Sequence, residues 1–296
     1  MSSSPKIETH TLRCFDGTRL FARWFTPLLP ASSPVATVVI THGLGEHSSR
    51  YGHVIQHLLT HGYEVVTYDI RGHGRSAGRR GDTPSFQAFL DDLGCVVGWV
   101  KQRRPTPRLF LYGHSMGGLI TLSFTLEDRE PLSGVIAAST WLRLTFQPPW
   151  WKLFIGRIMR HVYPGFRQFT GLDPMRLSHD IPFLTSMPDL ELSHHQLSAR
   201  LFYGALEACD RVMRSAHQIK TPLLLLHGQA DPITSWIATQ EFYELAGPTD
   251  KTLRLYPDFA HETHNERDRH VVLNDITDWL NHRCIDSLRS DDQKIA

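Results

Sequence analysis

The sequence predicts an α/β fold: a mostly parallel, eight-stranded sheet with helices on both faces and an inserted helical segment. Short apolar runs alternate along the chain with segments of helical periodicity, a rhythm that favours right-handed crossovers between parallel strands. Several runs are apolar throughout, as strands buried on both faces are. The alternation of apolar runs and helical segments stops between residues 141 and 219 and then resumes. These observations predict one large domain with one insertion.

The first two strands should form an antiparallel hairpin at one edge of the sheet, because Asp16-Gly17 between them is a strong turn signal. The later strands should be parallel, since helical segments separate them. In chain order, the eight predicted strands are residues 7–15, 19–26, 35–40, 64–70, 109–112, 134–138, 222–227 and 252–256.

Helices are expected between the strands. A short one covers residues 50–61, and Asp82-Thr83-Pro84 indicates the start of a second, because proline suits the first turn of a helix. Another follows Ser115, and a further helix runs through Trp236 and Phe242. The side chains expected on the buried faces of the second and the last helix are Phe89, Leu93, Val96, Val97 and Val100, then Val272, Ile276, Trp279 and Leu280.

Composition excludes several classes of function. The chain has 31 Lys and Arg against 30 Asp and Glu, so its charge does not indicate a nucleic-acid partner. No apolar run approaches the roughly 20 residues of a membrane span, and the polar N-terminus lacks the core of a secretion signal. Scattered cysteines at positions 14, 95, 209 and 284 indicate reduced thiols in a cytoplasmic protein without a metal site, although a disulfide stays open.

The turn Gly113-His114-Ser115-Met116-Gly117 joins an apolar strand to a helix with a serine at its apex. A turn of this kind holds the serine in a strained conformation and projects its hydroxyl above a parallel sheet. Glycines are needed on both sides, because strand and helix approach too closely for a β-carbon. We therefore expect Ser115 to be a nucleophile; an ordinary loop serine is the alternative.

A serine hydroxyl needs a base, and His261 lies in the loop after the last predicted strand. His264 is the alternative, as a base or as a solvated loop histidine. The base needs a carboxylate, for which Asp231 follows a buried strand in a turn made rigid by proline. Asp258 is the second candidate, but it lies close to His261 in sequence. The order Ser115, Asp231, His261 is that of the α/β-hydrolases.

The negative charge of a tetrahedral intermediate requires two N–H donors. The backbone of Met116, the residue after the nucleophile, should supply one. The glycine-rich loop after the third strand should supply the other, and we assign it to the backbone of Leu44, next to Gly43. A simple glycine-rich turn is the alternative. No metal or organic cofactor is expected, because no zinc, phosphate-loop or dinucleotide motif is present.

Five motifs resemble the monoglyceride lipase group of capped α/β-hydrolases, a group of serine hydrolases often described as lysophospholipase-like. They are His42-Gly43-Leu44-Gly45-Glu46-His47 with Arg50-Tyr51, residues 68–76, Gly113-His114-Ser115-Met116-Gly117-Gly118, residues 227–231, and residues 250–253 leading to His261. The resemblance implies the same triad and the same two oxyanion donors. It also implies that residues 141–219 form a cap over a core of residues 1–140 and 220–296.

Aromatic residues crowd the predicted cap, with cations between them. On a helix, Trp151, Phe154, Ile155 and Ile158 would share a face. This face either packs on the sheet domain, lines an acyl tunnel, or rests on a membrane with its cations at the headgroups. If it lines a tunnel, these four residues bind substrate together with Gly43.

We therefore expect a serine carboxylic ester hydrolase that acts on a lipid-like monoester, either monoacylglycerol or lysophospholipid. A cytoplasmic enzyme with transient contact between its cap and a membrane surface would fit this substrate. The alternatives are a general carboxylesterase or a thioesterase, then a lactonase, a peptidase or a cofactor-free haloperoxidase, and a non-catalytic binding protein of the same fold. The oligomeric state stays open.

Overall fold

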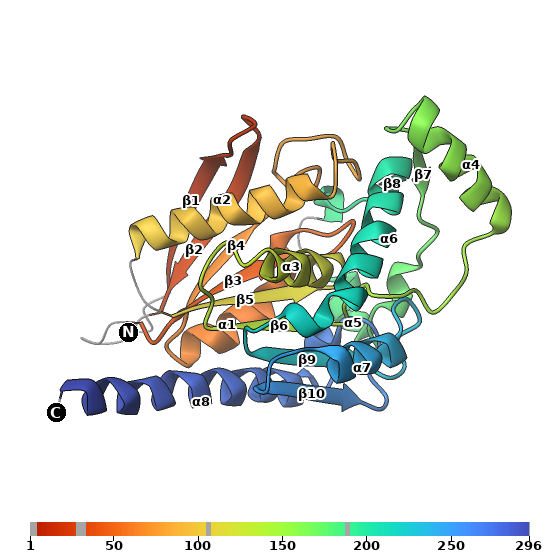
Figure 1. Cartoon of the computed structure of the whole chain (residues 1–296). Helices are drawn as coiled ribbons and strands as arrows, with labels where there is room; N and C mark the ends of the chain where they lie inside the picture. Colours follow the sequence, from red (N-terminus) through yellow and green to blue (C-terminus); the bar gives the residue numbers. More distant parts are fainter. Residues whose placement is uncertain (1–4, 28–33, 105–107, 187–189, 296) are drawn as a thin grey trace.

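A computed structural model describes residues 5–27, 34–104, 108–186 and 190–295. Its main sheet has eight strands in the order β1-β2-β4-β3-β5-β6-β9-β10 (Figure 1). β1 pairs antiparallel with β2 and β2 with β4, and the other neighbours are parallel. The predicted mostly parallel sheet with a leading hairpin is thus confirmed. The strands are β1 (Lys6–Arg13), β2 (Arg19–Thr26), β3 (Thr37–Thr41), β4 (Glu64–Tyr68), β5 (Leu109–His114), β6 (Gly134–Ala138), β9 (Leu223–Gly228) and β10 (Lys251–Tyr256).

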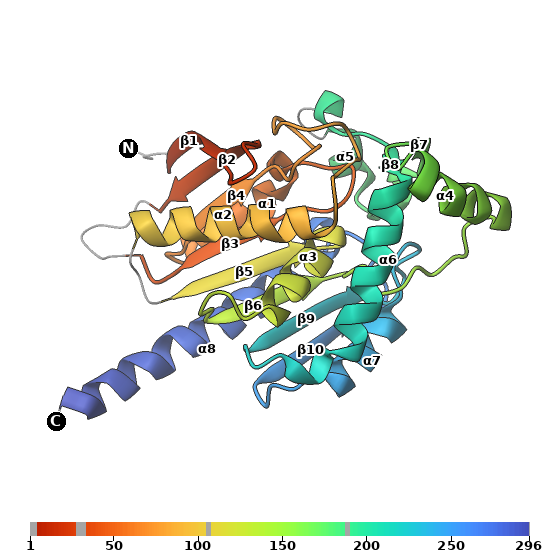
Figure 2. The same ribbon diagram turned by 45° about the horizontal axis from the view of Figure 1, so that its top comes forward.

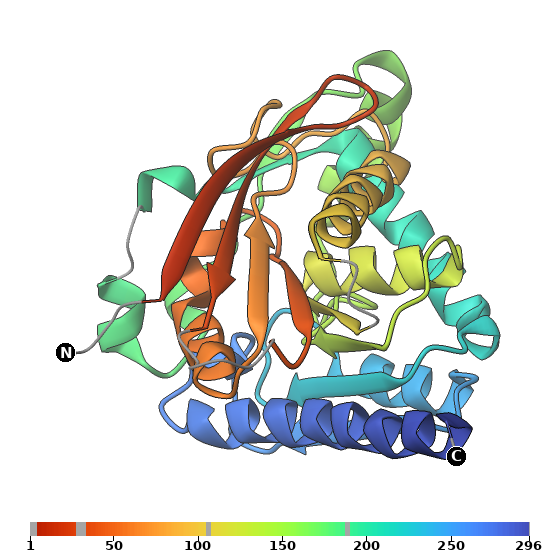
Figure 3. The same cartoon turned by 90° about the vertical axis from the view of Figure 1, so that its left-hand side faces the viewer.

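Every residue of β3, β4, β5, β6 and β9 is buried, which agrees with their unbroken apolar runs. One core cluster unites the sheet with α2 (Gln87–Arg103), α3 (Met116–Leu126), α6 (Ala199–Arg214) and α7 (Trp236–Leu245). A second cluster unites it with α1 (Gly52–Thr60) and α8 (Arg269–Ile295). The sheet is therefore covered on both faces, as Figure 3 shows.

The start of α2 differs from the prediction. The helix begins at Gln87, and Pro84 lies in the turn before it. Ser85 provides the local start instead, because its Oγ accepts a hydrogen bond from the Ala88 amide at 3.3 Å. The buried face of α2 is as predicted.

The chain between β6 and β9 projects beyond the carboxyl ends of the strands (Figure 2). It contains α4 (Trp150–Val162), α5 (Ile181–Thr185) and the short antiparallel pair β7 (Arg167–Phe169) and β8 (Gln196–Ser198), before α6 returns to the sheet. Short 3₁₀ turns, η2 (Pro174–Arg176), η3 (Leu190–Leu192) and η4 (Ala216–Gln218), connect these elements, as η1 (Ser48–Tyr51) and η5 (Thr263–Asn265) do elsewhere. We call the segment from 141 to 198 the overhang.

Among the helices in the described part of the chain, none has the length and apolarity needed to cross a bilayer. The described residues also contain no cluster of histidine, cysteine or carboxylate side chains that could hold a metal ion.

Candidate active site

Ser115 lies between the end of β5 and the start of α3, with φ 55° and ψ −118°. This is a left-handed conformation that a residue with a side chain rarely adopts, and such strain is typical of functional sites. Close packing explains the neighbouring glycines. A β-carbon on Gly117 would lie 2.1 Å from the Thr41 carbonyl oxygen, and one on Gly113 would lie 2.4 Å from the Gly117 oxygen.

The structure brings together the two residues predicted as base and acid. The His261 Nδ1–H donates to Asp231 Oδ2 at 2.7 Å, which leaves Nε2 as the acceptor on the other side of the ring. The amides of Ile233 and Thr234 donate to Asp231 Oδ1 at 2.7 and 3.0 Å, and the Thr234 hydroxyl donates to Oδ2 at 2.7 Å. These bonds fix the carboxylate in the turn after β9.

Asp231 is buried, which by itself raises its pKa. The facing His261 ring and the hydrogen bonds from His227 and His261 outweigh burial, so its pKa lies well below the usual range. The His227 Nε2–H contributes a bond of 3.1 Å. This role of His227 was not predicted from the sequence, although His227 lies in the motif that leads to Asp231.

The two alternative residues lie elsewhere. His264 is fully buried and stacks on Tyr51, with ring centroids 4.9 Å apart. Burial and the nearby His114 charge hold its pKa well below the usual value, so it stays neutral. The side chain of Asp258 is exposed, and among the described contacts it has no bond to His261.

The loop after β3 approaches Ser115 closely. A β-carbon on Gly43 would lie 3.1 Å from the Ser115 Cβ, so the backbone of residues 43–44 lies beside the serine. Within the described residues, neither the Leu44 nor the Met116 amide donates a hydrogen bond to another protein group. Both predicted oxyanion donors therefore have their N–H groups available.

A buried ionic network, which was not predicted from the sequence, supports this loop. The Glu46 carboxylate accepts hydrogen bonds from the Gly43 amide, the Tyr51 hydroxyl and the His114 ring, and pairs with Arg50 at 3.1 Å. Burial raises the pKa of Glu46, but the His114 hydrogen bond and the charges of His114 and Arg50 outweigh it and lower the pKa well below its usual range. The motif Gly45-Glu46-His47 was the available signal.

His114 connects this network to the base. Its Nδ1 lies 3.2 Å from Glu46 Oε1 and its Nε2 lies 3.2 Å from the His261 carbonyl oxygen. Both acceptors are oxygens without hydrogen, so both ring nitrogens donate. Burial lowers the pKa of His114, but the hydrogen bond and charge of Glu46 outweigh it and raise the pKa above its ordinary value. Its side chain points into the network beside His261.

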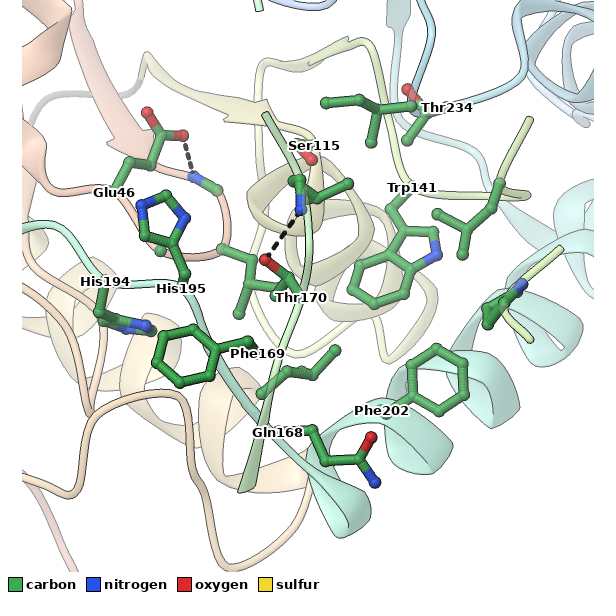
Figure 4. Close-up of a pocket in the computed structure, with 18 of the residues that line it drawn as sticks. Glu46, Ser115, Trp141, Gln168, Phe169, Thr170, His194, His195, Phe202 and Thr234 are labelled. Atoms are coloured by element: carbon green, nitrogen blue, oxygen red, sulfur yellow. Dashed lines mark hydrogen bonds between the residues drawn. The ribbon is translucent and has the colours of Figure 1, made fainter. Parts of the chain in front are cut away.

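A cavity of about 450 Å³ opens at Ser115 and His261. In Figure 4 three of its polar residues, Glu46, His194 and His195, gather on one side, and Trp141 and Phe202 lie on the other. Much of the remaining wall is apolar and comes from the overhang and α6; it includes Leu144, Phe146, Pro148, Pro149, Leu153, Phe169, Leu172, Leu177, Leu190 and Leu197.

The face of α4 that was predicted to line a tunnel does not line this cavity. Trp151, Phe154, Ile155 and Ile158 are exposed, with 47%, 61%, 38% and 46% of their surface accessible. The cavity contacts the opposite side of the helix, at Lys152, Leu153 and Gly156. Of the three alternatives for these four residues, lining of this cavity is therefore not observed. The helix is amphipathic, but its apolar face is the exposed one, and the apolar spacing alone did not tell which way that face points.

Comparison with known proteins identifies the family of this chain. The hydrolase family model described as "Serine aminopeptidase, S33" matches residues 32–268. An uncharacterized abhydrolase domain-containing protein of Dictyostelium discoideum is 34% identical over 90% of this chain, which spans 28% of that protein's length. The monoglyceride lipase of Rattus norvegicus is 30% identical, over 90% of this chain and 88% of the relative.

A solved structure extends the likeness to three dimensions. The crystal structure of the Paleococcus ferrophilus monoacylglycerol lipase superposes with a TM-score of 0.80 at 29% identity, covering 89% of this chain and 99% of that one. The predicted α/β-hydrolase fold is confirmed. The chain therefore belongs to this hydrolase family and, within it, to the monoglyceride-lipase-like α/β-hydrolases, and it is a carboxylic ester hydrolase.

Proposed function

We propose that this enzyme cleaves the ester bond of a monoacylglycerol or a lysophospholipid through an acyl-Ser115 intermediate. The observation that carries the proposal is the cavity at Ser115, which has a polar side and a long apolar wall. A lipid monoester has the same division into a polar head and one acyl chain. The name of the rat relative, monoglyceride lipase, supports the same substrate class.

We propose the following steps for these residues. His261 Nε2 takes the proton of the Ser115 hydroxyl as its oxygen attacks the ester carbonyl carbon, and Asp231 stabilises the resulting imidazolium. The Leu44 and Met116 amides donate to the developing oxyanion. His261 then protonates the leaving alcohol. A water molecule, deprotonated by His261, attacks the acyl-serine, which releases the fatty acid and restores the Ser115 hydroxyl.

We further propose that residues 141–219 act as a cap and that the outer face of α4 touches a membrane surface. Trp150, Trp151 and Phe154 are 78%, 47% and 61% exposed. Arg157 is exposed on the same helix, and the Lys152 Nζ lies 5.7 Å from the centroid of the Trp151 ring. Exposed aromatic residues beside cations suit the boundary between acyl chains and anionic headgroups. A cytoplasmic enzyme with such a face would reach its substrate by peripheral contact.

A substrate panel tests the proposal: monoacylglycerols, lysophospholipids and p-nitrophenyl esters of increasing chain length, each with the Ser115→Ala variant as control. We expect the highest kcat/KM with long-chain lipid monoesters and no acyl transfer by the variant. A maximum at acetate or butyrate would assign a general carboxylesterase instead. A maximum with acyl thioesters would assign a thioesterase, and substantial esterase activity of Ser115→Ala would overturn the acyl-serine mechanism.

A further inference from the structure

The loop that carries the Leu44 amide is in direct contact with the overhang. The backbone amide of His194 donates a hydrogen bond to the Gly45 carbonyl oxygen at 2.9 Å. Gly45 has φ +78°, and a β-carbon on it would lie 2.3 Å from the His194 oxygen. The two backbones therefore touch with no side chain between them, and only glycine permits this approach.

The core holds the other side of the same loop. The Gly43 amide donates to the buried Glu46 carboxylate, and Gly43 packs against the Ser115 Cβ. The Leu44 amide thus lies between two anchors, one at Gly43 in the core and one at Gly45 on the overhang. Because an oxyanion donor is effective only when it is fixed at the right place, both anchors bear on its orientation.

The anchoring segment Ser193–His195 is itself tied down and lines the cavity. The Thr170 amide donates to the His195 carbonyl oxygen at 2.9 Å. The Ser198 amide donates to the Gly81 carbonyl oxygen at 2.8 Å, which joins the overhang to the loop before α2. The His194 ring packs on His73, with centroids 4.5 Å apart. The segment is therefore positioned from both the overhang and the core.

We infer that the backbone amide of His194 is a positioning group for the oxyanion hole, so that the Leu44 amide is correctly placed only while the segment Ser193–His195 is docked on Gly45. The inference rests on the proposed function, because it assumes that Leu44 serves an acyl-transfer reaction. The overhang must then be docked for the chemical step as well as for substrate binding. Loss of the contact should lower kcat and leave KM nearly unchanged.

The sharpest test replaces His194 by its α-hydroxy acid through nonsense suppression. This change removes one N–H and keeps the side chain. The matched control is the same replacement at Gly171, an exposed overhang residue outside the cavity wall whose amide makes no hydrogen bond among the described residues. Activity is measured with p-nitrophenyl acetate, which is too short to need the acyl wall, together with the inhibition constant of a trifluoromethyl ketone, whose adduct places an oxyanion in the hole.

Loss of a direct donor lowers kcat by roughly 100- to 1000-fold, so loosening one of two anchors should lower it by about 10-fold. We expect this loss at position 194, a matching rise in the ketone's inhibition constant, and less than about a twofold change in KM. The control at 171 should behave as wild type. An unchanged kcat at 194, or equal losses at 194 and 171, would overturn the inference.

A pair of ordinary substitutions gives an independent check. Gly45→Ala must push the segment Ser193–His195 away, whereas Gly17→Ala places the same residue at φ +81° with no atom within 4 Å. Both variants carry the strain of alanine in a left-handed conformation, and only Gly45→Ala should lower kcat on the acetate ester. If the inference fails while Ser115→Ala is inactive, the acyl-serine mechanism still stands; if Ser115→Ala is active, the proposed function itself is wrong.

Discussion

The sheet domain and helix α4 use apolar side chains in opposite ways. In the central strands and in α3 nearly every residue is buried, and two apolar clusters cover both faces of the sheet. In α4 only Gly156 is buried, and its large aromatic residues face outward. The core is therefore organised by its own packing, whereas α4 presents a surface that the described chain does not cover. We therefore expect core substitutions to change catalysis and stability, and substitutions on the outer face of α4 to change contact with a membrane surface.

The largest effect is expected in the core, from Asp231→Asn. The change removes the charge that stabilises the His261 imidazolium and disturbs the tautomer that its Nδ1–H bond selects. We expect kcat to fall by about 10,000-fold, with KM little changed. Steady-state kinetics on a soluble ester measures this. The control is Asp258→Asn, which changes the second carboxylate candidate, an exposed residue. A loss of less than about tenfold would remove Asp231 from its assigned role.

Replacing a glycine should cost much more stability in the core than in α4. Gly117→Ala forces a β-carbon to 2.1 Å from a backbone oxygen that cannot move aside, so we expect about 3 kcal/mol or more of destabilisation. Gly156→Ala in α4 meets the Tyr203 ring at 3.3 Å and gains helix propensity. Its net effect should lie within about 1 kcal/mol of wild type. Urea unfolding of both variants tests the contrast, and similar losses would contradict it.

The contact between core and overhang should weaken in acid. Burial lowers the pKa of His194 to about 4, helped by the charge of Arg80, and burial likewise lowers the pKa of His47 to about 4. Between a pH of about 6.5, the usual histidine pKa, and a pH of about 4, the folded protein therefore binds fewer protons than the unfolded chain. Stability therefore falls as the pH drops from about 6.5 to about 4. Thermal unfolding across this range should show Tm falling with pH, and Tm should fall less steeply in His194→Asn. Equal pH dependence of Tm in both proteins would contradict a contribution from His194.

The smallest effect is expected on the outer face of α4. The double variant Phe154→Ser, Ile158→Ser should keep wild-type stability and wild-type kcat/KM on a soluble ester, because neither side chain lines the cavity. Activity on monoacylglycerol in anionic vesicles should fall by about threefold or more through weaker adsorption. Vesicle sedimentation measures the adsorption directly. Equal activity in both assays would exclude a membrane role for this face.

The two regions also differ in what their sequences could predict. The central sheet was predictable because buried parallel strands are mostly apolar, and Ser115 and Asp231 were predicted because each follows such a strand. His261 follows β10, which is only partly buried, and was predicted from its place after the last strand. The contacts that hold these residues in place were not predictable, since those of Glu46 with His114 and of Gly45 with His194 join segments far apart in sequence. In α4 the apolar spacing gave a helix but not the direction of its faces, which depends on Leu153 and Gly156 packing toward α6 and the cavity.

Labelling with a fluorophosphonate probe, followed by intact mass and peptide mapping, tests the central claim most directly. A nucleophile activated by His261 should form one adduct per chain, located on Ser115. The adduct should be absent from Ser115→Ala, and its formation should be slowed by about 1000-fold or more in His261→Ala. An adduct on another residue, or a labelling rate that does not change without His261, would contradict the account.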